Sequence, residues 1–140
     1  MQRTLTIIKP DSMEAGNAGN ILAHLESAGF RIVAIRRLQL SETQARGFYE
    51  VHAERPFYDS LVEFMTSGPV TAAVLEREDA VAHLRSAMGA TDSTQAEEGT
   101  IRALYGTNIE RNAIHGSDSE ANASIESQFF FSRADLIAAV

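Results

Sequence analysis

Short apolar and alternating segments along the chain predict strands. Residues 4–8 are rich in β-branched side chains and Pro10 ends the run, which predicts a buried strand. Residues 31–40 alternate between apolar and polar positions, which predicts a half-buried strand. Its apolar face would carry Ile32, Ala34, Leu38 and Leu40. Residues 70–75 form a further apolar segment that predicts a short strand.

Four other segments predict helices, either from apolar residues at helical spacing or from the signals at their ends. These segments are residues 19–28, 41–52, 56–66 and 79–88. Gly29 ends the first of them and Gly89 ends the last. Ser41 and Gln44 form a capping-box pattern at the start of the second, and Gly68 interrupts the chain after the third.

Residues 90–111 are rich in small and polar side chains and predict a long loop, with one turn of helix at residues 100–104. A loop of this length in a small domain usually signals function or disorder. The order of elements is strand–helix–strand, a helical insert, and then strand–helix–loop–strand. This order gives two βαβ units and predicts an α+β sandwich with one mostly antiparallel sheet.

A last helix is predicted to begin at Ser117. Ser117 and Glu120 match the capping-box pattern. Apolar residues follow at helical spacing, namely Ala121, Ile125 and Phe129. The free N–H groups at the start of this helix would point toward His115 and favour a phosphate there.

His115 and Gly116 directly precede that helix and suggest chemistry on phosphate. Imidazole is largely neutral near pH 7, so His115 could attack phosphorus without a separate base. Gly116 has no Cβ, which would let the backbone approach a ligand closely. The sequence therefore predicts a nucleophilic histidine beside a phosphate site.

Composition limits the classes of function. A chain of 140 residues predicts one domain, residues 1–140, without an apolar run that could span a membrane or a basic-then-apolar leader. The absence of cysteine excludes disulfides and thiolate metal sites, and suits a cytoplasmic protein. A net charge of −7 argues against general nucleic-acid binding, and no basic face or RNP-type aromatic run supports it.

Lys9 is the only lysine among 12 basic residues. The other 11 are arginines, yet a compact ammonium stands at the end of the first predicted strand, directly before Pro10. The alternative is a surface lysine that has survived by chance. Its position favours a role in binding a sugar hydroxyl or a phosphate.

The string Asn112-Ala113-Ile114-His115-Gly116-Ser117-Asp118 resembles the active-site signature N-x-x-H-G-S-D of the nucleoside diphosphate kinases. Further landmarks of this family occur in the same order along residues 3–130. They are Thr6-Ile7-Ile8-Lys9-Pro10-Asp11, Gly47-Phe48-Tyr49, Pro56-Phe57, Phe64-Met65-Thr66-Ser67-Gly68-Pro69 and Gly99-Thr100-Ile101-Arg102. A single short motif would be weak evidence, but several in the right order are specific.

The resemblance implies a ferredoxin-like fold with a four-stranded antiparallel sheet and an inserted helical hairpin. It implies transfer of the γ-phosphate of a nucleoside triphosphate to a nucleoside diphosphate by a ping-pong mechanism, through a phosphohistidine at His115. Glu126 would accept a hydrogen bond from the Nε2–H of His115 and leave Nδ1 free to attack. Without the resemblance, Glu126 would be taken for a solvated helix residue.

The resemblance also implies the other site residues. Those on the phosphate side are Arg85, Thr91, Arg102, Tyr49 and His52. The nucleobase would lie between Phe57 and Ile109, and the sugar hydroxyls would meet Lys9 and Asn112. Ser117 completes the predicted nucleotide site.

No histidine and carboxylate pair has metal-ligand spacing, so no resident metal site is predicted. Magnesium would arrive on the phosphates of the nucleotide. His24 and His83 match no motif and are assigned to structure. The alternative function is a non-catalytic nucleotide-binding regulatory domain, which would be expected to lack His115 or the site arginines.

One departure from the family concerns assembly. Family members commonly read Thr-Asn-Pro where this chain has Thr91-Asp92-Ser93, in a loop that contributes to subunit contacts. Loss of the proline frees φ and should loosen the loop. We expect a dimer-based homo-oligomer, with a tetramer as the favoured assembly. An apolar tail could help to hold it, through Leu136, Ile137 and Val140.

Overall fold

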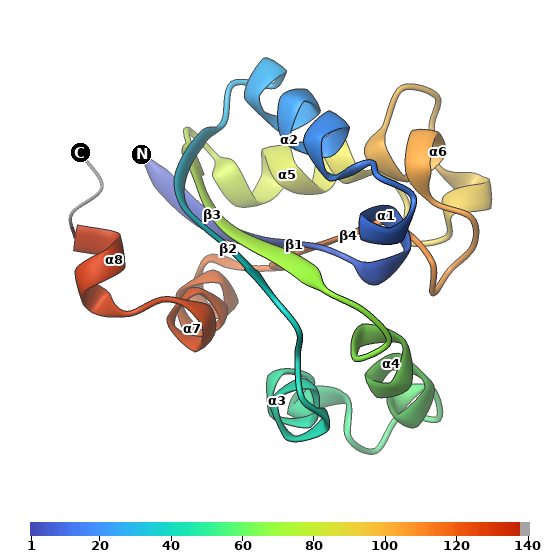
Figure 1. Ribbon diagram of the computed structural model, residues 1–140. Helices are drawn as coiled ribbons and strands as arrows, with labels where there is room; N and C mark the ends of the chain where they lie inside the picture. The colour runs from blue at the N-terminus through green and yellow to red at the C-terminus, as the bar shows by residue number, and fades with distance from the viewer. Residues whose placement is uncertain (138–140) are drawn as a thin grey trace.

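The computed structural model describes residues 1–137, and its centre is a four-stranded antiparallel sheet (Figure 1). The strands are β1 (Gln2–Ile8), β2 (Arg31–Leu38), β3 (Val70–Arg77) and β4 (Ile114–Gly116). Their order in the sheet is β2-β3-β1-β4, so β2 and β4 form the edges. The predicted α+β, ferredoxin-like class is confirmed.

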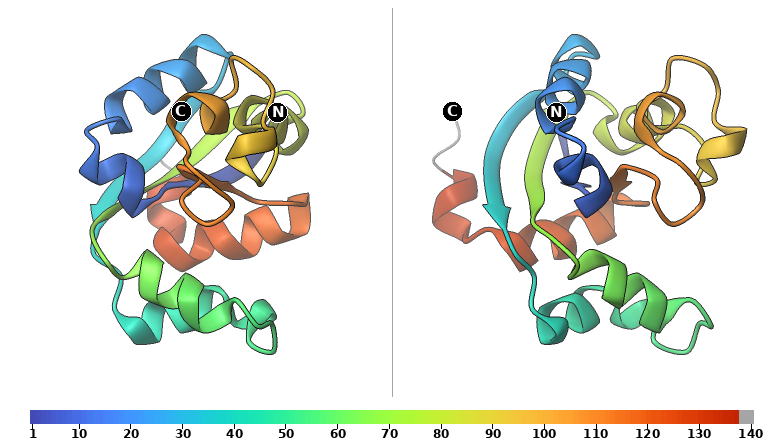
Figure 2. Two further views of the ribbon diagram at one scale, coloured as in Figure 1. Left: turned by 90° about the vertical axis from the view of Figure 1, so that its right-hand side faces the viewer. Right: turned by 45° about the vertical axis from the view of Figure 1, so that its right-hand side comes forward.

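Helices cover both faces of the sheet. They are α1 (Pro10–Glu14), α2 (Ala18–Ser27), α3 (Glu42–Phe48), α4 (Tyr58–Met65), α5 (Ala80–Met88), α6 (Ile101–Tyr105), α7 (Glu120–Phe130) and α8 (Arg133–Ile137). Helices α2 and α5 lie on one face and α7 on the other, while α3 and α4 extend from one end as the inserted hairpin (Figures 1 and 2). Two 3-10 turns complete the described elements, Glu50–His52 and Ser93–Gln95.

The two faces of β1 bury different side chains, which gives two apolar cores. Leu5 and Ile7 belong to the core that α3, α4 and α7 cover, whereas Ile8 belongs to the core under α2, α5 and α6. Thr4 and Thr6 are also fully buried. Since both faces of β1 are covered, the strand shows no clean alternation of apolar and polar residues.

Most predicted elements are confirmed with small shifts at their ends. The helix predicted for residues 41–52 ends at Phe48, and a 3-10 turn follows it. Its capping box is formed, because the Gln44 N–H donates to Ser41 Oγ at 3.1 Å and the Ser41 N–H donates to Gln44 Oε1 at 2.9 Å. The helix predicted for residues 56–66 begins two residues later, at Tyr58.

The predicted start of the last helix is wrong. Helix α7 begins at Glu120, and its cap is Ser119, whose Oγ accepts a hydrogen bond from the Asn122 N–H at 3.0 Å. Ser117 instead continues the extended chain after β4: its N–H donates to Leu5 O at 3.1 Å, and its hydroxyl donates to Glu126 Oε1 at 2.9 Å. The helix can begin only after this extended stretch ends.

The predicted apolar face of that helix is wrong as well. The later start leaves Ala121, Ile125 and Phe129 exposed. The buried face instead carries Ala123, Ser127 and Phe130. Because Ser127 is polar but buried, the spacing of apolar residues alone does not reveal this face.

The long loop of residues 90–111 contains α6, which confirms the predicted turn of helix. Two hydrogen bonds stabilise the loop at Asp92 and Ser93, where the sequence departs from the family motif. Asp92 Oδ1 accepts a hydrogen bond from the Thr94 N–H at 3.0 Å, and the Ser93 N–H donates to Asn108 O at 3.4 Å. A proline at position 93 has no N–H and could not make the second bond. The loop is therefore held by other interactions than a proline.

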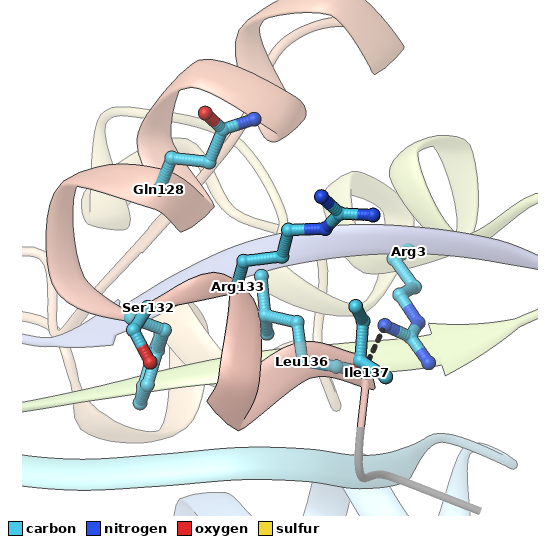
Figure 3. Close-up of a pocket in the computed structure, with 7 residues that line it drawn as sticks. Arg3, Gln128, Ser132, Arg133, Leu136 and Ile137 are labelled. Atoms are coloured by element: carbon cyan, nitrogen blue, oxygen red, sulfur yellow. Dashed lines mark hydrogen bonds between the residues drawn. The ribbon is translucent and has the colours of Figure 1, made fainter.

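The C-terminal tail folds back on the sheet. Leu136 packs against the core beneath α7, so it is not free to cover another subunit, whereas Ile137 is exposed and Val140 lies outside the described residues. A hollow of about 640 Å³ lies beside it, and Arg3 Nη1 donates to Leu136 O there at 3.0 Å (Figure 3). Its lining residues are Arg3, Gln128, Phe131, Ser132, Arg133, Leu136 and Ile137, and none is a predicted site residue.

Within residues 1–137 no helix is both long enough and apolar enough to span a membrane.

Candidate active site

His115 lies in the middle of the edge strand β4. Its position is fixed by the pairing of β4 with β1, in which His115 lies opposite Ile7. Thr6 Oγ1 donates to His115 O at 2.8 Å and holds the backbone there. The imidazole remains partly exposed. The sheet thus holds the imidazole in a fixed position with access to solvent.

Glu126, on α7, lies against the imidazole. Its Oε1 is 2.7 Å from His115 Nε2 and also accepts a hydrogen bond from Ser117 Oγ at 2.9 Å. A carboxylate accepts hydrogen bonds, so Nε2 carries the ring proton and Nδ1 keeps its lone pair in neutral imidazole. The contact leaves Nδ1 as the ring nitrogen with a free lone pair.

Two aromatic rings pack edge-on against the imidazole. The ring centroids of Phe48 and Tyr49 lie 5.5 and 6.2 Å from that of His115. The Tyr49 hydroxyl is buried without a hydrogen-bond partner in the described residues. Burial, with the charge of Glu126, raises the pKa of Tyr49, so its phenol stays protonated and can donate. The sequence motif contained Phe48, but its contact with His115 was not predicted.

A row of rings leads from Tyr49 to the predicted nucleobase site. His52 stacks on Tyr49 with centroids 6.5 Å apart, and Phe57 lies 5.5 Å beyond His52. Phe57 is 46% exposed, and Ile109 is 63% exposed. The structure therefore brings the predicted phosphate-side residues next to the predicted aromatic platform.

Arg102 is a buried cation bound to the residue before His115. It is 6% exposed, and its Nη1 and Nη2 donate to Gly89 O at 3.1 Å and to Ile114 O at 2.8 Å. Its Nε has no partner in the described residues. Burial, followed by the charge of Arg85, lowers the pKa of Arg102 to about 10. The site therefore holds a charged donor with unused capacity.

Lys9 is a second buried cation, 7% exposed, whose Nζ donates to Asn112 Oδ1 at 2.8 Å. Burial, followed by the charge of Arg102, lowers the pKa of Lys9 to about 8. Arg85 approaches from α5, where its Nη1 donates to Gly116 O at 3.4 Å. Within residues 1–137 none of these three cations forms an ion pair. After burial, the charge of a neighbouring arginine is the second cause that lowers the pKa of Lys9 and of Arg102, as expected where cations gather to bind an anion.

Asn112 joins the parts of this site. It is buried, accepts from Lys9, and donates through Nδ2 to Thr91 O and to Ile109 O, each at 3.0 Å. Both Thr91 and Ile109 are exposed at the surface of their loops. Asn112 therefore fixes the loops that carry two of the predicted nucleotide-binding residues.

Gly116 is required by the packing of helix α5. A Cβ there would lie 2.5 Å from Met88 Sδ and 2.9 Å from Leu84 Cδ2. This close approach was not predicted from the sequence. This packing also brings Arg85, on the same helix, to the backbone next to His115.

The sequence of residues 2–136 matches the family described as nucleoside diphosphate kinase. The chain belongs to the nucleoside diphosphate kinase family. It is an enzyme that transfers the γ-phosphate of a nucleoside triphosphate to a nucleoside diphosphate.

Relatives and solved structures agree with this family. The chain is 50% identical over 137 residues to a nucleoside diphosphate kinase of Persephonella marina, with 98% of each chain covered. It is 54% identical over 137 residues to one of a Methylobacterium species, again with 98% of each chain covered. Two solved structures are also similar. The Aquifex aeolicus nucleoside diphosphate kinase has a TM-score of 0.95 and 48% identity, covering 96% of this chain and 98% of that one. The halophilic Halobacterium salinarum nucleoside diphosphate kinase, in complex with CDP, has a TM-score of 0.93 and 41% identity, and the match covers 96% of this chain and 90% of that one.

The buried ammonium of Lys9 predicts how the stability of the kinase depends on pH. Its pKa is about 8 in the folded chain against an ordinary value of 10.5, so the unfolded chain binds more protons between these values. The free energy of unfolding should therefore gain a contribution as pH rises from about 8 to 10.5. We expect Lys9→Met to lack this contribution in chemical denaturation across that range, relative to the parent enzyme. An identical pH dependence in both proteins would contradict it.

Proposed function

We propose that the kinase works by a ping-pong mechanism with His115 as the phosphate carrier. The Nδ1 lone pair attacks the γ-phosphorus, the bond from that phosphorus to the bridging oxygen breaks, and the electron pair leaves on the nucleoside diphosphate. In the second half-reaction, a β-phosphate oxygen of another nucleoside diphosphate attacks, and the N–P bond breaks. The observation that carries this proposal is the 2.7 Å contact of Nε2 with Glu126, which directs reactivity to Nδ1.

The three cations around His115 would hold the phosphates. Phosphoryl transfer depends on positioning and on stabilising charge at the transferred group. Arg102 and Arg85 carry guanidinium forks that suit the phosphate oxygens, and Lys9 adds a compact charge. The unpartnered Tyr49 hydroxyl is a further donor on the same side. His52 and Thr91 complete the phosphate side.

The nucleoside would occupy the slot between Phe57 and Ile109. Both apolar side chains are exposed, so a base stacked between them would remove apolar surface from water. Ser60 Oγ donates to Glu110 Oε2 at 2.7 Å and links α4, which follows Phe57, to the loop that carries Ile109. Stacking uses a face common to all bases, which would give broad base specificity. Lys9 and Asn112 would meet the sugar hydroxyls.

Ser117 is proposed to act through Glu126. Its side chain is fully buried and its hydroxyl donates to the carboxylate that holds the imidazole. This geometry supports a positioning role for Ser117 more than direct contact with a nucleotide.

Magnesium is proposed to enter with the nucleotide. In residues 1–137 no group of three or more His, Cys, Asp or Glu side chains is placed to hold a metal ion. Mg²⁺ loses its water reluctantly and is commonly bound through substrate phosphates. The substrates, nucleoside di- and triphosphates, also agree with the cytoplasmic location that the sequence predicts.

Acid lability of the enzyme-bound phosphate tests the mechanism directly. The kinase is incubated with γ-labelled nucleoside triphosphate, and the label on the protein is followed in acid and in base. A phosphohistidine is expected, which is lost in acid and survives in base. Absence of label on His115, or an acid-stable label such as phosphoserine, would contradict the proposal.

Lys9→Arg should impair turnover although the charge is kept. Lys9 Nζ is enclosed by Asn112 and lies near Arg102, so the larger fork cannot occupy the same buried position. We expect kcat/KM to fall about tenfold, which corresponds to roughly 1.4 kcal/mol of transition-state stabilisation. Arg133→Lys, at an exposed position of α8, is the control and should leave kcat/KM unchanged. Parent-like turnover of Lys9→Arg would show that a compact ammonium is not required.

We also propose a dimer-based homo-oligomer, with a tetramer favoured. The exposed apolar side chains of Ile35, on the edge strand β2, and Ile137, at the end of α8, support it. Sedimentation at micromolar concentration is expected to show an even-numbered oligomer. A persistent monomer with full activity would refute the prediction, and a hexamer would show that Ser93 hardly weakens assembly.

A further inference from the structure

The residue two positions before the nucleophile has a strained backbone. Ala113 has φ of +73°, in the left-handed region that residues with a Cβ rarely adopt. The Ile114 N–H donates to Asn112 O at 2.8 Å, across Ala113. A hydrogen bond from residue i+2 to residue i with positive φ between them is the rare, strained form of the γ-turn. Such a turn persists only when its surroundings hold it.

Asp11, on α1, holds this turn from outside. Its Oδ2 accepts a hydrogen bond from the Ala113 N–H at 3.1 Å, although the two residues are 102 positions apart. The other carboxylate oxygen, Oδ1, is buried without a partner in the described residues. Burial raises the pKa of Asp11, and the bond from Ala113 opposes that rise. Burying this carboxylate costs desolvation energy. Formation of α1 alone does not explain why the carboxylate is kept there.

The turn is also connected to several parts of the site. The Lys9 N–H donates to Ala113 O at 2.9 Å, so both polar groups of the Ala113 backbone are bound by the segment of residues 9–11. Asn112, which bonds Lys9 Nζ, precedes Ala113, and His115 follows Ile114. A relaxed Ala113 would therefore shift Asn112 and His115 in relation to each other.

We propose that Asp11 is a positioning residue that keeps the Ala113 γ-turn in its strained form and so aligns His115 with the phosphate-binding cations. This inference rests on the proposed role of His115. The hydrogen bond that Asp11 Oδ2 accepts from the Ala113 N–H maintains the turn, and the charge of the carboxylate is not required. The alternative is that Asp11 acts as a counter-charge for Lys9, since its charge opposes the fall in the pKa of Lys9.

Three variants separate these possibilities. Asp11→Ala removes the acceptor. Asp11→Asn keeps an oxygen that can accept from the Ala113 N–H but removes the charge. Ala113→Gly removes the Cβ penalty, because glycine adopts positive φ readily. Glu14→Ala, an exposed position on the same helix, is the matched control.

The rate constant for phosphorylation of the enzyme is measured in single turnovers at saturating nucleotide, below the melting temperature of every variant. We expect Asp11→Ala to lower it about tenfold and Asp11→Asn to stay within about threefold of the parent. Combining Asp11→Ala with Ala113→Gly should restore at least half of the loss on a logarithmic scale. Hydrogen exchange of the Ala113 amide should be slow in the parent and in Asp11→Asn, and fast in Asp11→Ala.

Three results would overturn the proposal. They are a parent-like rate in Asp11→Ala, a rate in Asp11→Asn as low as in Asp11→Ala, and no recovery with Gly at position 113. A lower melting temperature of Asp11→Ala with an unchanged rate would indicate a purely structural role and would also overturn it. A parent enzyme without label on His115 would instead refute the mechanism, while amide exchange at Ala113 would still test the contact with Asp11.

Discussion

Replacing His115 with alanine is expected to abolish phosphoryl exchange while nucleotide binding persists. The proposed contacts to base, sugar and phosphates come from other residues, among them Phe57, Lys9 and Arg102. The imidazole offers a free lone pair at Nδ1, because its Nε2 faces Glu126. Exchange between nucleoside tri- and diphosphates would be measured together with the Kd for a nucleoside diphosphate by calorimetry.

Added imidazole sharpens this test. The deleted ring leaves a space beside Phe48 and Tyr49 that a free imidazole could enter, and a small rate should return. His24→Ala, a change far along the chain at a histidine that bonds Gly99 O, is the control and should keep full activity. Exchange near the parent rate in His115→Ala would exclude the covalent mechanism.

Much of the fold could be predicted from the sequence because its signals are local. Pro10, Gly29 and Gly89 end elements in the structure as they do in the pattern. The capping box of Ser41 and Gln44 also depends only on residues three apart. The order of these elements then restricts the topology to few alternatives.

The start of α7 could not be predicted because a distant strand decides it. Ser117 and Ser119 are equivalent as caps on sequence grounds, but Ser117 is held in extended structure by Leu5 O and by Glu126, so Ser119 caps the helix. The packing at Gly116 could not be predicted for a similar reason. A Cβ at position 116 would clash with Leu84 and Met88, which lie about thirty positions earlier in the sequence.

The site shows the same division between local and distant information. Motifs predicted the members of the site, including His115 and Lys9, and the structure places His115 against Glu126 and Lys9 against Asn112. Motifs could not reveal how residues 11 and 113 interact, because a strained φ leaves no mark in composition when the residue is alanine. A non-glycine residue with positive φ can be recognised only from coordinates.

Arg102→Met is expected to lower kcat/KM by about a hundredfold or more, which is typical for loss of one preorganised donor to a developing charge. The variant loses a buried cation and the two bonds that tie it to Gly89 and to Ile114, the residue before His115. Because those bonds also support the fold, melting temperatures and circular dichroism are measured in parallel, and kinetics are compared well below the transition.

Arg102→Lys separates charge from geometry at the same position. Lysine keeps the positive charge but cannot make both backbone bonds from a planar fork, so its activity should lie between those of the parent and of Arg102→Met. Arg133→Met, on the exposed surface of α8, controls for the loss of one arginine and should keep parent activity. If folded Arg102→Met retained kcat/KM within about threefold of the parent, Arg102 would serve the loop and not the transferred phosphate. The stabilising charge would then have to come from Lys9 and Arg85 alone.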